Sequence, residues 1–164
     1  MNRMELRDNG AVSTDSLLYR ALTVGDLLGA WLLARPLLEP GRTECLNALT
    51  VFNCSLCLFR LGDYERALTL LKRAERLFSS AAGVNTAERK LFVQAVETTD
   101  ASLLPLDPEW GSGMEQYALI RVRWLTALCL LRLGREQEAA PILRFLAQYH
   151  ICPDGRAAGT EDVP

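Results

Sequence analysis

A glycine followed five residues later by an alanine recurs along this chain, and this recurrence constrains the fold more than any other feature. The pairs are Gly25 and Ala30, Gly62 and Ala67, and Gly134 and Ala139. The glycines are separated by 37 and 72 residues, and 72 is twice 36, so a unit of about 36 residues repeats. Glycine permits a tight reversal between two helices, and a small alanine lets the second helix cross the first closely. The spacing therefore predicts helical hairpins.

Apolar residues on either side of these glycines recur at helical spacing, and no segment shows the period of two that indicates a strand. Helices are expected after the caps at 13–15, from 27 to 38, from Glu44 to Leu61, from Tyr64 to Phe78, from a capping box at Asn85 to roughly Glu97, from 114 to 133 and from 137 to 149. The segment Asp100–Gly113 contains two prolines and two glycines and is expected to be irregular. The predicted fold class is all-α.

The length of 164 residues fits one domain, and the content of 49% hydrophobic and 23% charged residues is typical of a globular protein. Residues 1–12 are expected to form a flexible N-terminal lead, because they are polar and lack a helical period. Residues 13–150 form the predicted helical repeat domain. Residues 151–164 lack an apolar period and are expected to form a flexible C-terminal tail.

The repeat resembles the tetratricopeptide repeat family, and the segment Leu49–Phe78 carries the best match. There Gly62, Asp63, Tyr64, Ala67 and Ala74 are similar to the family pattern G-x-Y-x-x-A-x-x-x-x-x-x-A. A second unit matches at Ala127, Leu130, Gly134 and Ala139, with Leu146 in place of the second alanine. The resemblance implies a TPR-like right-handed stack of antiparallel helix pairs. A bundle without repeats, in which the glycine and alanine spacing is coincidental, is the alternative.

The resemblance also implies a concave groove, lined by the first helix of each pair, that holds a peptide or an amphipathic helix of another protein. By position, the groove residues are Phe52, Asn53, Leu56, Phe59 and Arg60 from one unit and Arg121, Trp124, Leu128 and Leu131 from another. An apolar groove of this kind suits a segment with regularly spaced apolar anchors. Two other interpretations remain open: these aromatic side chains form ordinary core, or the segment Leu103–Leu106 occupies the groove as an internal plug.

No pattern in the sequence indicates catalysis or a bound cofactor. The chain has no glycine-rich phosphate loop and no G-x-S-x-G or H-E-x-x-H motif. Cys54 and Cys57 form a C-x-x-C pair, but the chain has one histidine and no second such pair, so a metal site lacks ligands. Buried cysteines of structural character are expected instead. The protein is therefore expected not to be an enzyme and to hold no metal or cofactor.

The charge and the cysteine content bear on partners and compartment. The net charge of −2, with basic residues interleaved with acidic ones, argues against a nucleic-acid partner. The longest apolar run, Leu27–Ala34, is too short to span a membrane, and the N-terminus does not resemble a signal peptide. Five cysteines, an odd number, argue against a secreted disulfide framework, which favours a cytoplasmic location.

The predicted function is that of a non-enzymatic protein–protein interaction module: an adaptor, a scaffold or a chaperone. The alternative is a self-assembling structural subunit, a homodimer formed through the apolar helices around Trp31 and Leu143.

Overall fold

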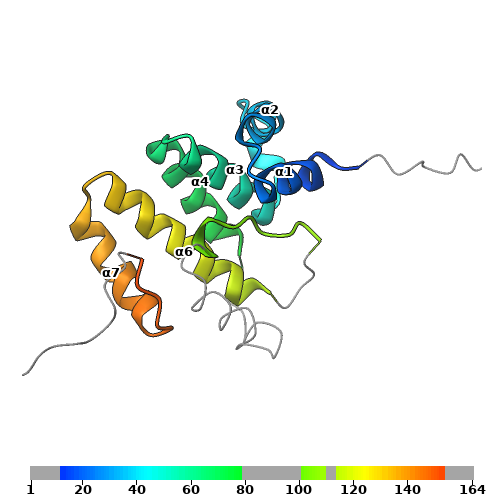
Figure 1. The fold of residues 1–164 in the computed structure, drawn as a ribbon. Coiled ribbons are helices and arrows are strands. Elements are labelled where there is room, and N and C mark those ends of the chain that lie inside the picture. The colour runs from blue at the N-terminus through cyan, green and yellow to red at the C-terminus, as the bar shows by residue number, and fades with distance from the viewer. Residues whose placement is uncertain (1–11, 79–100, 110–113, 154–164) are drawn as a thin grey trace, which may run out of the picture.

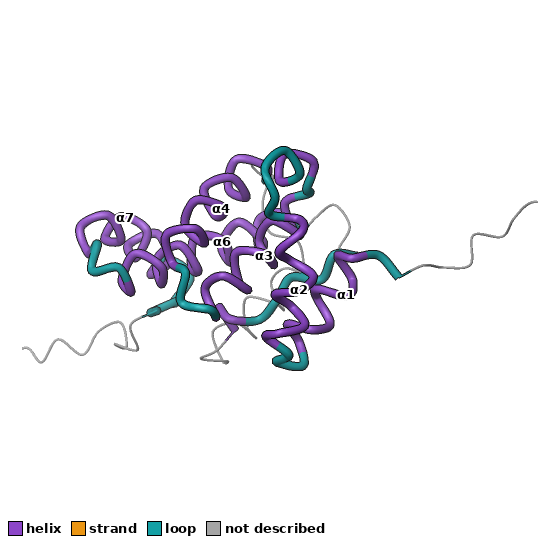
Figure 2. Tube along the Cα trace, turned by 90° about the horizontal axis from the view of Figure 1, so that it is seen from above, coloured by secondary structure: helices purple, strands orange, loops and turns teal. Residues whose placement is uncertain are grey.

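The computed structural model describes residues 12–78, 101–109 and 114–153. These residues form helices joined by loops, without a strand in the described ranges, as Figures 1 and 2 show. The α-helices are α1 (Thr14–Thr23), α2 (Leu27–Leu37), α3 (Ala48–Arg60), α4 (Tyr64–Leu77), α6 (Glu115–Arg132) and α7 (Glu136–Ala147), and the 3-10 turns are η1 (Thr43–Cys45) and η2 (Ala101–Leu103). The predicted all-α fold class is confirmed for the described residues.

The predicted start of the third helix is wrong by four residues. A helix was expected from Glu44, but α3 begins at Ala48 and is preceded by η1. Asn47 caps α3, because its backbone is extended and its side-chain oxygen accepts a hydrogen bond of 2.9 Å from the Thr50 amide. The helix expected after Asn85 lies outside the described residues, as do residues 1–11 and 154–164.

The three hinges predicted from the glycines are confirmed. Gly25, Gly62 and Gly134 have φ angles of 77°, 82° and 71°, in the left-handed region that glycine adopts at little cost. At the second hinge the Gly62 amide donates to the Phe59 carbonyl at 3.0 Å, and the following amide donates to the Leu58 carbonyl at 2.9 Å. The other two hinges repeat both bonds at the equivalent positions. This pair of bonds is the Schellman motif, which ends a helix and satisfies its last carbonyls.

The hinges produce three helical hairpins, α1 with α2, α3 with α4, and α6 with α7, which follow one another along the molecule (Figure 1). The alanine five residues after each glycine, Ala30, Ala67 or Ala139, is fully buried. Successive hairpins also pack on each other, since α2 contacts α3 and α4 contacts α6.

The apolar core runs through the described hairpins and is densest around α3. Every residue from Thr50 to Phe59 is buried, as expected for a helix that is apolar nearly all round. Helix α6 contributes buried residues along most of its length. The core extends beyond α7 to Ile151, which was assigned to the tail but is 3% exposed.

Candidate functional site

Three polar side chains lie in the otherwise apolar region between α3 and α6, and we call them the clasp. Asn53 and Arg60 come from α3, and Arg121 comes from α6. Asn53 is 1% exposed and Arg121 is 2% exposed, whereas Arg60 is partly buried. All three bind the main chain of one segment, Ser102–Leu106, which starts in the 3-10 turn η2 and continues as a loop, and which we call the strap.

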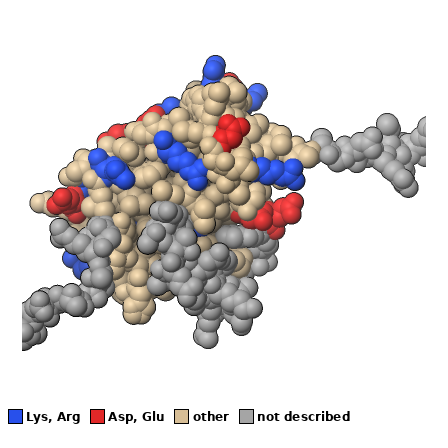
Figure 3. Space-filling model, viewed as in Figure 1, with Lys and Arg blue, Asp and Glu red and all other residues tan. Residues whose placement is uncertain are grey.

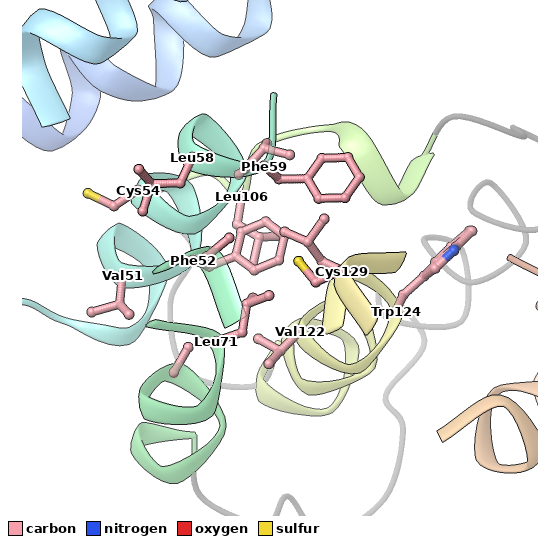
Figure 4. Packing of buried hydrophobic residues seen from close by; sticks show 14 of the residues in the cluster. Val51, Phe52, Cys54, Leu58, Phe59, Leu71, Leu106, Val122, Trp124 and Cys129 are labelled. Atoms are coloured by element: carbon pink, nitrogen blue, oxygen red, sulfur yellow. The ribbon is translucent and has the colours of Figure 1, made fainter. Parts of the chain in front are cut away.

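Asn53 forms two hydrogen bonds with a single residue of the strap. Its Nδ2 donates to the Leu106 carbonyl at 2.8 Å, and the Leu106 amide donates to its Oδ1 at 2.8 Å. The side-chain amide therefore satisfies both main-chain groups of a buried residue, as a neighbouring strand would in a sheet. The Leu106 side chain is fully buried and lies beside Phe52 (Figure 4).

The two arginines bind the carbonyls that precede Leu106. Arg60 donates from Nη2 to the Leu103 carbonyl and from Nη1 to the Leu22 carbonyl at 2.7 Å, so it also ties α1 to α3. Arg121 donates from Nη2 to the Leu104 carbonyl. Every bond from the clasp to the strap thus reaches a main-chain group, and the clasp recognises a backbone rather than particular side chains.

The described residues around Arg121 offer its charge neutral groups only. Its guanidinium lies 5.6 Å from the ring centroid of Phe52 and 5.7 Å from that of Tyr117, whose hydroxyl accepts a bond of 3.0 Å from Nη1. Burial lowers the pKa of Arg121, and the contact with Tyr117 opposes this shift. Burial also lowers the pKa of Arg60. Within the described ranges no carboxylate forms an ion pair with either arginine.

The structure brings the three polar residues of the predicted groove together and buries most of the apolar ones. Phe52, Leu56, Phe59 and Trp124 are buried, and Leu128 and Leu131 are partly buried. The segment Leu103–Leu106, which was considered as an internal plug, is bound through its main chain by Asn53, Arg60 and Arg121. Trp124 points away from the cluster around Phe52 and Leu106 (Figure 4).

Sequence reasoning missed Tyr117, which contacts Arg121 through both its ring and its hydroxyl. The signal was present, because residues four apart on a helix lie on the same face. Tyr117 precedes Arg121 by four residues, so the spacing alone indicates that the ring and the guanidinium are neighbours.

The cysteine pair has the properties of packed side chains. Burial raises the pKa of Cys54 to about 12 and that of Cys57 to about 11, with Cys57 adding to the shift at Cys54 and Arg60 opposing it at Cys57. A protonated thiol is a poor nucleophile and a poor metal ligand. Among the described residues, no three His, Cys, Asp or Glu side chains are grouped to hold a metal ion.

The surface carries charges of both signs. On the face shown in Figure 3, Lys and Arg side chains are interspersed with Asp and Glu. No helix in the described part of the chain combines the length and the apolar character needed to cross a membrane.

No family model, curated protein or solved structure matches this chain. Its function is therefore inferred from the clasp and the strap.

Proposed function

We propose that this protein is a non-enzymatic interaction module, an adaptor, scaffold or chaperone, that holds an extended segment of a partner protein between α3 and α6. The observation that supports the proposal is the strap itself. It is a short segment of loop and 3-10 turn bound through its main chain by the clasp, with a leucine buried beside Phe52. A partner segment would take the place of the strap and use the same contacts.

The arrangement of hairpins supports a stack of the tetratricopeptide type. The hinge recurs with the same hydrogen bonds, and α4 packs against both α3 and α6. The first helices of successive pairs also meet, since α3 contacts both α1 and α6. In a right-handed stack of helix pairs these first helices line one side, and the clasp lies on two of them.

The contacts of the clasp favour an extended partner over a helical one. Asn53 pairs with both the amide and the carbonyl of Leu106. In a helical partner these two groups would already form the hydrogen bonds of the helix, so they would not be free to bind Asn53. Burial of one leucine in the place of Leu106 would contribute roughly 1.5–3 kcal/mol. The main-chain bonds would fix the register of the segment rather than supply most of the affinity.

A peptide with the sequence of the strap tests the proposal. Fluorescently labelled SLLPLDP, residues 102–108, is added to the full chain carrying Leu106→Gly, which weakens the hold of the internal strap. We expect the anisotropy to rise on binding, more weakly with the unsubstituted chain and not with a scrambled peptide. Adding Asn53→Ala to the Leu106→Gly chain should reduce binding. If the folded Leu106→Gly chain does not bind the peptide at millimolar concentration, the proposal is wrong.

Self-association is a second candidate, favoured by apolar side chains exposed on the first hairpin. Val24 is 78% exposed, Leu28 is 69% exposed and Leu32 is 59% exposed. Trp31 and Leu143, around which a dimer was predicted, are partly buried against the core, so the exposed leucines of α2 are the better interface. Light scattering over a range of concentrations tests this: a dimer that becomes a monomer with Leu28→Glu and Leu32→Glu would favour self-assembly, and a monomer throughout would exclude it.

A further inference from the structure

Among the described residues, four exposed or partly exposed arginines pair with carboxylates, whereas the most buried arginine does not. Arg66 pairs with Asp63, Arg123 with Glu75, and Arg135 with Glu65 and Glu138. Arg121 is 2% exposed and has no such partner among the described residues, and its Nε has no hydrogen-bond acceptor there. Arg121, which binds the strap, is thus a buried cation without a carboxylate partner in the described part of the chain.

An unpaired buried cation is unfavourable, because it loses its hydration and gains no counter-charge. The rings of Phe52 and Tyr117, the Tyr117 hydroxyl and the Leu104 carbonyl offset part of this cost. All of these groups are neutral. A carboxylate in the same place would form charge-assisted hydrogen bonds with the guanidinium, which are stronger than bonds to a carbonyl.

The path of the strap favours position 105 for such a carboxylate. Arg121 binds the Leu104 carbonyl, and Pro105, the next residue, is buried, whereas the Leu104 side chain is 44% exposed. A side chain in the place of Pro105 begins one peptide bond from the carbonyl that Arg121 holds. The chain continues past the clasp in both directions, through Ser102 and Asp107, so the site accepts an internal stretch rather than a chain end.

Building on the proposed function, we propose that the partner segment carries an acidic residue in the place of Pro105, directly before the apolar residue that replaces Leu106. Its carboxylate pairs with Arg121 and balances the buried charge. The recognised feature is an extended segment in which Asp or Glu precedes a leucine-like anchor.

The preference is tested first within the full chain, which needs no partner. Pro105→Glu is compared with Pro105→Gln, which has the same shape without the charge. We expect the glutamate chain to unfold at a higher urea concentration than the glutamine chain at pH 7. The difference should disappear with Arg121→Met. It should also shrink progressively as the pH falls below about 4.3, the ordinary Glu pKa, because the carboxylate then takes up a proton. This second measurement requires no change at Arg121.

The preference is then tested with peptides. SLLELDP and SLLQLDP are titrated against the Leu106→Gly chain, and the glutamate peptide should bind at least about tenfold more tightly, a difference of about 1.4 kcal/mol. The advantage should be lost with Arg121→Met.

The outcomes separate this inference from the proposed function. If both peptides bind equally and the two full-length variants are equally stable, the acidic preference is wrong while peptide binding stands. If no peptide binds but the glutamate chain is the more stable, the proposed function is wrong while the preference of Arg121 for a carboxylate stands. If the Pro105→Gln chain is more stable than the Pro105→Glu chain, and SLLQLDP binds at least as tightly as SLLELDP, the inference is overturned.

Discussion

Replacing Asn53 by alanine measures how firmly the strap is held. If the strap stayed in place, the buried amide and carbonyl of Leu106 would both lose their partner, at about 1–3 kcal/mol for each group. If the strap detached, these groups would return to water, and the burial of the Leu106 side chain, worth roughly 1.5–3 kcal/mol, would be lost instead. The route of lower cost prevails, so Asn53→Ala should release the strap. We expect a loss of about 2–3 kcal/mol, measured by urea unfolding, from a total of about 5–15 kcal/mol.

A double-mutant cycle identifies the mechanism. Leu106→Ala removes the apolar anchor and should cost about 2–5 kcal/mol alone. Once either change has released the strap, the other should cost little, so the double variant should fall short of additivity by more than about 1 kcal/mol.

Ser55→Ala is the matched control for this cycle. Ser55 is equally buried in α3, but its hydroxyl donates to the Val51 carbonyl of the same helix at 2.7 Å. Its effect should therefore add to that of Leu106→Ala. Additive losses for Asn53→Ala and Leu106→Ala, within about 0.5 kcal/mol, would refute the view that Asn53 acts by holding the strap.

Two further predictions concern the turns and the thiols. Gly62→Ala should lower the free energy of unfolding by about 1–2 kcal/mol through backbone strain alone, because an added Cβ at φ 82° meets no atom within 4 Å. His150→Gly should raise the free energy of unfolding, because His150 occupies the left-handed region at φ 60°. Urea unfolding measures both changes, and a shift in the same direction for the two variants would contradict the reasoning. Mass spectrometry after treatment with iodoacetamide at pH 8 should find label on the exposed Cys45 but not on Cys54 or Cys57. Burial raises the pKa values of these two thiols to about 12 and about 11. Because the folded state keeps these thiols protonated, stability should also fall as the pH rises above 9.0, the ordinary thiol pKa.

The hinges could be predicted from the sequence because their cause is local. A glycine that can adopt positive φ and an alanine at the helix crossing are visible in a single stretch of chain. The start of α3 was predicted wrongly for a local reason too. Leu46 continues the apolar pattern, but Asn47 has an extended backbone and caps the helix with its side chain, which stops the helix where the apolar pattern alone would extend it.

The burial of the predicted groove residues beneath the strap could not be decided from the sequence, because it depends on a contact between distant residues. Asn53 and Leu106 are 53 residues apart, and no periodicity links an asparagine in one helix to the main chain of a proline-containing loop. The sequence did single out the polar residues within apolar helices. What it could not show is that they bind the backbone of the chain itself and that the Phe52 side chain is covered as a result.

The hold of the strap sets the affinity that a partner in the proposed site would show. A strap held by about 2–3 kcal/mol leaves the site open in roughly one molecule in 30 to 160, and the apparent affinity of a competing segment falls by the same factor. A partner that supplied only carbonyls and a leucine would gain nothing over the strap, which is covalently attached and always present. It would need a contact that the strap lacks. Arg121 offers one, because its charge is buried and the strap gives it only the Leu104 carbonyl. Arg121, which receives only a neutral carbonyl from the strap, would therefore give an acidic competitor its advantage.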